Sequence, residues 1–342
     1  MKYKFGLCGP FDFQEKYTGG QSVKTREFYY GLCEKIGKSN IMILESTEYK
    51  KNPLSFFMKL ISMLKSCEHI VIFPAQNGIK IFAPICNFFK GSNKVHYNVI
   101  GGWLPQMLEA QSRLIKHMKK FDSILVETNV MKEQLQRLGL SNVYRVLNFK
   151  RLQPVETVNK CSEPIKLCYF SRVIKQKGIE DAVEVVERLN LEGYNCIFDI
   201  YGPVVDEYRE QFKKLKKSFS DKTTYKGKVD PLKSIEVLKK YDLQLFPTLY
   251  KTEGIPGAIV DSYFAGVPVV ASKWNSFDDV VKDGVTGKGY EFGNLEEFKI
   301  ILQELLDDVG KIYEMKQNCI VESRNYMANT VIRDFLEIIE KC

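Results

Sequence analysis

The chain alternates short apolar segments with longer stretches in which apolar residues recur at helical spacing. Apolar runs of four to six residues predict strands, and apolar positions three or four residues apart predict amphipathic helices. In the first half the predicted strands are Tyr3–Cys8, Ile41–Leu44, His69–Phe73, Val95–Ile100, Ser123–Val126 and Val143–Val146, and the predicted helices are Thr25–Ile36, Leu54–Lys65, Gly78–Phe89 and Val130–Leu138. Such alternation is typical of an α/β protein with parallel sheets.

A polar segment with two prolines, RLQPVETVNKCSEP (151–164), interrupts this alternation and predicts an interdomain linker. The pattern then restarts, with strands predicted at 165–170, 196–201, 242–247 and 267–272 and helices predicted to begin near Gly178 and after Asp230–Pro231. We therefore expect domains at 1–150 and 165–325, with a final helix at 326–342 that is able to pack back on the first domain. Two doubly wound domains would place a ligand cleft between the carboxyl ends of their sheets.

Length and composition agree with a globular protein of two domains. The 342 residues exceed one typical core. A net charge of +8, from 50 Lys+Arg against 42 Asp+Glu, favours anionic partners such as phosphates, nucleotides or an acidic lipid surface without selecting among them.

The cysteines, the histidines and the apolar runs indicate the cellular compartment and argue against a metal site and a membrane span. Nine scattered cysteines without a CxxC pair indicate free thiols in a reducing cytosol, and three dispersed histidines predict no metal site. The N-terminus lacks the apolar core of a signal peptide, and no apolar run reaches the length of a membrane span. A cytoplasmic protein is expected.

The loop after the first predicted strand contains a glycine pair, Gly19 and Gly20, directly before a helix. Glycines there would let backbone N–H groups approach a ligand at the positive end of the helix. For an isolated pair, an ordinary flexible loop explains the residues slightly better. The dinucleotide fingerprint GxGxxG is absent, which argues against a nicotinamide or flavin enzyme.

A second loop, SRVIKQKG (171–178), carries cations between a strand and a helix. Arg172 stands at the strand end, and Lys175 and Lys177 precede the helix. A guanidinium fork and a mobile ammonium suit a pyrophosphate. Solvent exposure explains Lys175, whereas the positions of Arg172 and Lys177 favour ligand contact.

A third loop, TEGIPGAIVD (252–261), has an acid at each end of a glycine- and proline-rich turn. Gly257 opens a predicted helix, and Asp261 lies one turn further on the same face. Favourable interaction with the helix dipole, about 0.3–1 kcal/mol, is enough to explain Asp261. It does not explain Glu253 or the glycines and proline that follow it.

Taken together, these loops resemble the motifs of the retaining GT-B glycosyltransferases of family 4, the glycosyl transferases of group 1. The frame E-x7-D within strand–EGxPG–helix–GVPVVAS resembles that family's E-x7-E motif, and FSRVIKQKG, DIYGP and DGVTG (283–287) follow the family's order. The resemblance covers essentially the whole chain, strongly from 165 to 293 and loosely in the first half. It implies an α/β, GT-B architecture of two Rossmann-like doubly wound domains facing each other across a cleft.

The resemblance also implies a role for each motif residue. Glu253 would hold hydroxyls of the transferred sugar, Arg172 and Lys177 would neutralise the pyrophosphate, and Asp261 would bind the nucleotide ribose. The remaining donor-binding residues would be Gly254, Ile255, Pro256 and Gly257 at the sugar and diphosphate, Gly202, Pro203, Lys228 and Val229 at the base, and Gly19 and Gly20 over the diphosphate from the other domain.

The implied activity is transfer of a sugar from a nucleotide-diphospho-sugar, a UDP-sugar, to a glycan or lipid-linked oligosaccharide in bacterial surface polysaccharide synthesis. No Asp-x-Asp occurs, so a metal bridge lacks its usual ligands, and fixed cations and amides would stabilise the leaving group instead. No metal, cofactor or nucleic-acid partner is expected.

Two departures from the family pattern concern the site. Asp261 is one methylene shorter than the usual glutamate, so its contact with the ribose is expected to be longer or mediated by water. Gly101-Gly102-Trp103 stands where a histidine is frequent, and His96 is expected in the core or on a sheet face.

Other interpretations remain open at this point. A UDP-sugar epimerase would keep the fold and change the reaction, a glycan phosphorylase would need a longer chain, and a non-catalytic subunit would only bind glycan or a partner. Segments 53–66, 79–89 and 113–120 are amphipathic or basic and could rest on an anionic leaflet, at about 1 kcal/mol per well-placed cation. Core-facing helices explain these segments better, and a solvated helix face explains KKLKK (213–217).

Overall fold

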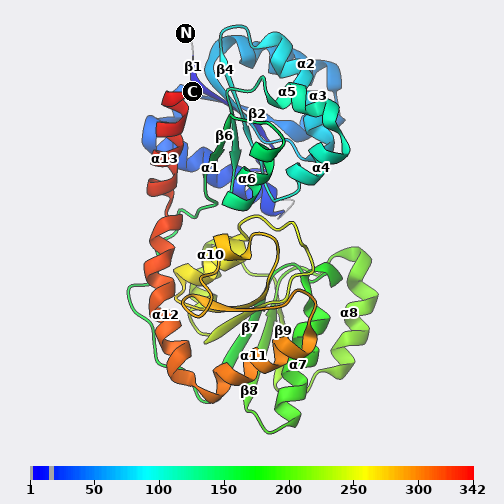
Figure 1. Ribbon diagram of the computed structural model, residues 1–342, viewed down its shortest axis with the longest axis vertical. Coiled ribbons are helices and arrows are strands. Elements are labelled where there is room, and N and C mark those ends of the chain that lie inside the picture. The colour runs from blue at the N-terminus through cyan, green and yellow to red at the C-terminus, as the bar shows by residue number, and fades with distance from the viewer. Residues whose placement is uncertain (1–2, 15–18) are drawn as a thin grey trace. The chain divides into compact units, whose positions relative to one another are not determined.

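The computed structural model describes residues 3–14 and 19–342, which form two compact units. One unit comprises the described residues up to 151 together with 326–342, and the other comprises residues 152–325. Each unit is built on a six-stranded parallel sheet with helices packed against it (Figure 1). The α/β class and the two doubly wound sheets predicted from the sequence are confirmed.

The first unit has strand order β2-β1-β3-β4-β5-β6. Its strands are β1 (Tyr3–Gly9), β2 (Ile41–Glu45), β3 (Cys67–Ile72), β4 (Lys94–Asn98), β5 (Ser123–Val126) and β6 (Val143–Arg145). Its helices are α1 (Gly20–Ile36), α2 (Pro53–Ser66), α3 (Gln76–Phe89), α4 (Leu104–Ala110), α5 (Ile115–Met118), α6 (Asn129–Arg137) and α13 (Ala328–Lys341). The helix predicted at Thr25 starts earlier, and α4 and α5 were not predicted.

Two hydrophobic clusters cover the two faces of this sheet. One gathers buried side chains of α2, α3 and α6 with alternate residues of the strands. The other gathers α1 and α13, with the Phe335 ring centroid 4.8 Å from that of Phe28 and 5.9 Å from that of Phe5. Figure 1 shows α13, from the end of the chain, beside α1 and this sheet.

A row of polar side chains crosses three strands of the same sheet. His69 Nδ1 lies 3.0 Å from His96 Nε2, and His96 Nδ1 lies 2.8 Å from Ser123 Oγ. Burial, followed by the effect of His69, lowers the pKa of His96 to about 3. The expected place of His96, in the core or on a sheet face, is confirmed.

The second unit has strand order β12-β11-β10-β7-β8-β9, all parallel. Its strands are β7 (Ile165–Phe170), β8 (Cys196–Tyr201), β9 (Thr223–Gly227), β10 (Leu243–Phe246), β11 (Val269–Ser272) and β12 (Gly287–Tyr290). Its helices are α7 (Ile179–Leu191), α8 (Arg209–Leu215), α9 (Ser234–Leu238), α10 (Gly257–Phe264), α11 (Leu295–Asp307) and α12 (Val309–Ser323). The direction of strand progression reverses between β7 and β10, where doubly wound sheets bind ligands.

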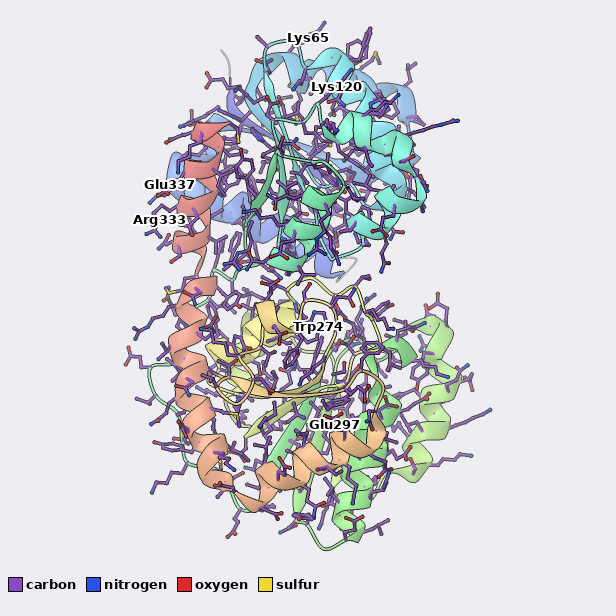
Figure 2. The ribbon with its side chains drawn as sticks, in the orientation of Figure 1. Lys65, Lys120, Trp274, Glu297, Arg333 and Glu337 are labelled. Atoms are coloured by element: carbon purple, nitrogen blue, oxygen red, sulfur yellow. The ribbon has the colours of Figure 1, made fainter. Side chains whose placement is uncertain are left out.

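Local sequence signals explain where several of these helices start and stop. Asp230 Oδ1 accepts a hydrogen bond from Leu232 N at 2.9 Å, and Asn294 Oδ1 accepts one from Glu297 N at 3.1 Å, so each side chain caps the helix that follows it. In a full capping box the Glu297 carboxylate would accept a hydrogen bond from Asn294 N. Glu297, seen in the first turn of α11 in Figure 2, accepts one from Glu291 N instead, so only the Asn294 half of the motif forms. Gly266, with φ 65°, follows the last turn of α10, a place where glycine is favoured.

The polar segment 151–164 is held against the second unit by hydrogen bonds. Val155 N donates to Phe264 O at 2.8 Å, and Ser162 Oγ donates to Asp242 Oδ2 at 2.6 Å. Asp242 also pairs with buried Lys316 at 2.9 Å. Among the residues described, no helix is long and apolar enough to cross a membrane.

Candidate functional site

The sequence motifs of the second unit meet at the carboxyl edge of its sheet. Arg172 follows β7, Pro203 follows β8, Lys228 follows β9 and Glu253 follows β10. Because all strands of this sheet are parallel, the loops that follow them lie at one edge. The predicted Arg, Lys and Glu positions therefore belong to one set of neighbouring loops.

Backbone hydrogen bonds hold the loops after β7, β8 and β9 together. Val173 N donates to Pro203 O at 2.9 Å, and Gly202 N donates to Gly227 O at 2.8 Å. Gly202 has φ 135°, and a Cβ there would lie 1.8 Å from Ser171 O. Only glycine allows the two loops to come this close, and their contact fixes the backbone beside Arg172 and Pro203.

Arg172 has an exposed side chain on a fixed backbone. The hydroxyl of buried Tyr169 donates to Arg172 O at 2.8 Å. Burial raises the pKa of Tyr169 well above its usual range, while the nearby Arg172 charge lowers this pKa and the nearby Glu253 charge raises it. Both charges therefore lie within electrostatic reach of one tyrosine.

Lys177 and Glu253, 76 residues apart in sequence, form an ion pair. Their side chains are only 11% and 14% exposed. Glu253 Oε1 also accepts a hydrogen bond from Thr248 Oγ1 at 2.9 Å. Thr248 is fully buried, and its carbonyl accepts a hydrogen bond from Ser272 Oγ at 2.5 Å, so the carboxylate is anchored to the sheet edge.

Two aromatic rings complete the surroundings of Lys177. Its Nζ lies 5.4 Å from the Phe246 ring centroid and 5.2 Å from that of Tyr250, distances at which a cation is attracted to a ring. Phe246, Thr248 and Tyr250 were not predicted as site residues. The signal was present in LFPTLY (245–250), where hydroxyl and aromatic residues continue past the strand end.

Gly178 brings the loop that carries Lys177 into close contact with the segment after β10 that leads to Glu253. Its φ is 69°, and a Cβ would lie 1.7 Å from Pro247 O. Leu249 N donates to Gln176 O at 2.8 Å. The ammonium and the carboxylate are thus carried by two loops that are fixed to each other.

The Gly/Pro-rich turn leads directly into α10. Gly254, Ile255 and Pro256 are buried, and Pro256 precedes the helix without a side-chain cap. Pro256 has no N–H, so the amides expected from residues 254–257 come from the other three residues. Its carbonyl accepts from Ile259 N at 3.0 Å and Val260 N at 3.2 Å.

Asp261 is buried in α10, with 5% of its surface exposed. Its Oδ1 accepts a hydrogen bond from Ser234 Oγ at 3.1 Å. Ser234 is the first residue of α9, which packs against α10. Ser234 was not predicted, because a serine that opens a helix looks like an ordinary cap.

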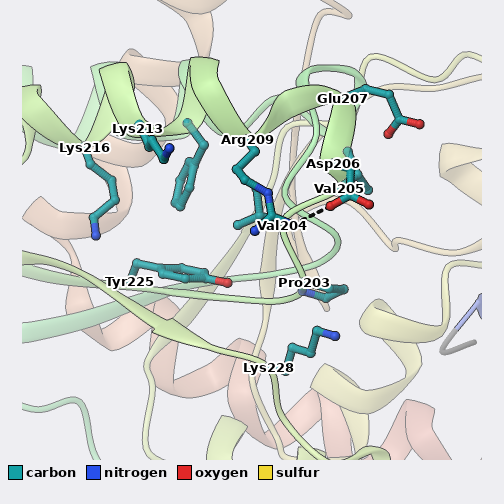
Figure 3. Close-up of a pocket in the computed structure, with 11 residues that line it drawn as sticks. Pro203, Val204, Val205, Asp206, Glu207, Arg209, Lys213, Lys216, Tyr225 and Lys228 are labelled. Atoms are coloured by element: carbon teal, nitrogen blue, oxygen red, sulfur yellow. Dashed lines mark hydrogen bonds and ion pairs between the residues drawn. The ribbon is translucent and has the colours of Figure 1, made fainter. Parts of the chain in front are cut away.

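A pocket of about 740 Å³ lies beside the same loops (Figure 3). Of the four residues predicted at the base, Pro203 and Lys228 line this pocket, whereas Gly202 and Val229 are not among its lining residues. The rest of the lining comes from residues that were not predicted, namely Val204, Val205, Asp206, Glu207, Arg209, Phe212, Lys213, Lys216 and Tyr225.

Gly19 and Gly20 belong to the first unit, at the start of α1. A Cβ added to either glycine would meet no described atom within 4 Å. Packing among the described residues therefore does not require glycine at these positions. Residues 15–18 of the same predicted loop lie outside the described residues.

Metal-binding side chains do not gather in the described part of the chain. No group of three or more His, Cys, Asp or Glu side chains there is arranged to hold a metal ion.

Comparison with known proteins places this chain beside sugar-transferring enzymes. The family model described as glycosyl transferases group 1 matches residues 130–326. An uncharacterized glycosyltransferase of Methanocaldococcus jannaschii is 29% identical over 210 residues, 58% of this chain and 52% of that protein. An uncharacterized 41.2 kDa protein in the cps region of Klebsiella pneumoniae is 24% identical over 214 residues, 60% of this chain and 56% of that protein. The matches span about half the length of these relatives.

Solved structures share the architecture at low sequence identity. Anabaena HepE in complex with UDP and glucose superposes with a TM-score of 0.77 at 13% identity, covering 99% of this chain and 100% of HepE. A mutant of S. aureus TarM has a TM-score of 0.67 at 16% identity, covering 84% of this chain and 59% of TarM. Such likeness concerns the fold, and it confirms the expected GT-B class.

Proposed function

The chain belongs to the glycosyl transferases group 1 family, and from that premise we propose that it transfers a sugar from a nucleotide-diphospho-sugar to a glycan or lipid-linked acceptor. We propose UDP as the nucleotide, since HepE and TarM structures contain it. The proposal includes retention of anomeric configuration, independence of metal ions and a cytoplasmic place in surface polysaccharide synthesis.

The observation that carries the proposal is the cluster of Lys177, Glu253 and Thr248 at the carboxyl edge of the second sheet. A single, largely buried carboxylate accepts bonds from a cation and a hydroxyl there. A hydrophobic core requires none of these groups, and buried charges are costly unless they are paired. Their position at a ligand-binding sheet edge favours a functional role.

In the proposed reaction the bond between the anomeric carbon and the diphosphate oxygen breaks while the acceptor hydroxyl oxygen bonds to that carbon. The hydroxyl proton passes to the departing phosphate oxygen. Negative charge grows on the diphosphate, and Arg172, Lys177 and the positive end of α10 would stabilise it. Glu253 would hold hydroxyls of the transferred sugar, and Asp261 would hold the ribose together with Ser234.

The Lys177–Glu253 ion pair gives the donor a defined entry step. Without donor, the cation and the carboxylate neutralise each other. The bound diphosphate would draw the ammonium away, and the sugar hydroxyls would then donate to the freed carboxylate. Each charge exchanges one partner for another, so neither is left unpaired in a poorly solvated place.

The first test is a thermal-shift screen with UDP, GDP, ADP and their sugar conjugates, followed by assays of donor hydrolysis without acceptor, with and without EDTA. We expect stabilisation by one nucleotide and slow release of that nucleotide, unaffected by EDTA. Release that EDTA abolishes would contradict metal independence. Conversion of the sugar with the nucleotide still attached would indicate an epimerase, and binding without release would indicate a non-catalytic subunit.

A further inference from the structure

The surface around α8 and β9 holds a large share of the positive charge of the chain. Residues 206–228 include eight lysines and arginines against four acids, in a protein with a net charge of +8. From sequence alone the run KKLKK reads as a solvated helix face. The structure separates its lysines, because Lys213 and Lys216 line the pocket beside α8 whereas Lys214 and Lys217 do not.

We call this cavity the α8–β9 pocket, lined by residues 203–207, 209, 212, 213, 216, 225 and 228. Two of its cations are paired on the surface, Arg209 with Asp206 and Lys213 with Glu210. Exposed pairs of this kind contribute little, so these cations stay available to a ligand. Lys216 and Lys228 form no ion pair with any described residue.

An aromatic ring lies in this positively charged pocket. The Tyr225 hydroxyl donates to Gly202 O at 2.9 Å, and the ring meets Phe212 edge-on, with centroids 5.0 Å apart. These contacts fix the ring before any ligand arrives, which lowers the entropic cost of binding. In Figure 3 the Tyr225 ring lies between the side chains of Lys216 and Lys228.

We propose that the α8–β9 pocket binds an anionic saccharide, one that carries carboxylate or phosphate groups on its sugar rings. The C–H face of a sugar ring is apolar and would pack on Tyr225, while the anionic groups would pair with Lys213, Lys216 and Arg209. A bare phosphate would make no packing contact with the Tyr225 ring, and a neutral sugar would form no ion pair with the lysines and arginine of the pocket. The volume of about 740 Å³ lies within the range of small-molecule sites.

The choice of a saccharide, rather than another anion with an apolar face, rests on the proposed function. A glycosyltransferase handles glycans as acceptor and product, and an acidic glycan chain is the occupant that matches both the ring and the cations. Pro203 and Lys228 also belong to the predicted base-binding set. The pocket therefore adjoins the predicted base site at these two residues and continues along α8.

The test is calorimetric titration with tetragalacturonate, with maltotetraose as the neutral counterpart. The variant Lys213→Glu/Lys216→Glu reverses two charges that line the pocket. The matched control, Lys214→Glu/Lys217→Glu, makes the same charge change in the same run outside the lining. We expect the parent and the control to bind tetragalacturonate equally, the lining variant to bind about tenfold more weakly, and maltotetraose not to bind.

Three results would overturn the inference: no tetragalacturonate binding by the parent, equal losses in both variants, or equally tight binding of maltotetraose. Displacement of tetragalacturonate by UDP would assign the pocket to the nucleotide instead. Donor hydrolysis by the same proteins separates this inference from the proposed function. If the parent hydrolyses a nucleotide sugar but does not bind tetragalacturonate, only the inference about the pocket is wrong. If the parent binds tetragalacturonate but hydrolyses no nucleotide sugar, only the proposed function is wrong.

Discussion

The ion pair of Lys177 and Glu253 is the most constrained pair of charges in the candidate site. The Lys177 ammonium is also near two aromatic rings, and the Glu253 carboxylate also accepts from a buried threonine. Each charge therefore has partners that hold it in place before a substrate arrives. Removing one partner changes the electrostatic surroundings of the other, so the two side chains must be tested separately.

Replacing Glu253 by glutamine keeps the size of the side chain and its bond from Thr248 but removes the charge that pairs with Lys177. We expect transfer to fall by about a hundredfold or more, with UDP affinity kept or increased because Lys177 becomes free for the diphosphate. Initial rates and calorimetry with UDP measure both effects, and Glu296→Gln, at an exposed position of α11, is the control. A large loss of UDP affinity in Glu253→Gln would contradict the sugar-binding role.

Replacing Arg172 or Lys177 by alanine removes a cation that we assign to the diphosphate. Each change is expected to weaken UDP binding by about 1.5–3 kcal/mol, the usual worth of a charged hydrogen bond. Lys175→Ala is the matched control, because Lys175 is exposed in the same loop and should leave UDP affinity unchanged. If both variants bind UDP as the parent does, the diphosphate assignment is wrong.

At the level of elements, the site depends on how closely the loops after neighbouring strands approach one another. Gly178 and Gly202 each place their α-carbon against a carbonyl oxygen of another loop. Both have positive φ, which a residue with a Cβ adopts at a cost. The close contact between these loops therefore fixes the backbone positions from which the Arg172 and Lys177 side chains extend.

The substitution Gly202→Ala should therefore destabilise the protein. A Cβ 1.8 Å from Ser171 O forces the loops after β7 and β8 apart. We expect the free energy of unfolding to fall by at least about 2 kcal/mol, measured by urea titration. Gly20→Ala is the control, since its Cβ would meet no described atom within 4 Å. Equal stability of Gly202→Ala and the parent would refute this account of the loop contact.

The histidine row across β3, β4 and β5 should make stability depend on pH. Burial lowers the pKa of His96 to about 3 and also lowers that of His69. Below about pH 6.5 the unfolded chain binds protons that the folded sheet excludes, so stability falls as pH falls from 6.5 toward 3. We expect His96 to account for about 2 kcal/mol between pH 7.5 and pH 5.

Urea midpoints at pH 7.5 and pH 5 measure this loss. The variant His96→Asn keeps a hydrogen-bonding group near Ser123 and should show a smaller difference between the two midpoints. An unchanged difference would mean that other groups cause the pH dependence.

For the molecule as a whole, the predicted strands are present with bounds within about two residues, because apolar runs between polar loops mark buried parallel strands well. Strand β12, GKGY, was missed because two glycines hide its strand character. The Arg172, Lys177 and Glu253 loops were predicted because they follow such strands. Thr248 and Tyr250 were not, since hydroxyl and aromatic residues past a strand end do not by themselves show that they contact Glu253 and Lys177.

The first unit exposes apolar side chains on α2 and α3 that a fully core-facing helix would bury. Leu54 is 73% exposed, Met58 59% and Phe88 79%. Figure 2 shows Lys65 and Lys120 at one end of the same unit. We expect the protein to sediment with vesicles containing phosphatidylglycerol and to remain in solution with pure phosphatidylcholine.

The variant Met58→Glu/Phe88→Glu should abolish that sedimentation, because it places charge where the acyl boundary would lie. A parent protein that stays in solution with the anionic vesicles would refute the contact with a membrane surface.

Helix α13 has a consequence for the order in which the protein is made. Its Val331, Ile332, Phe335 and Ile339 complete the hydrophobic cluster that covers Phe5 and Phe28 near the start of the chain. A ribosome must therefore translate the whole of the second unit before the first can close its core. Until residues 328–341 leave the exit tunnel, the nascent first unit lacks the helix that covers this apolar face, and a chain truncated before α13 would leave the face exposed.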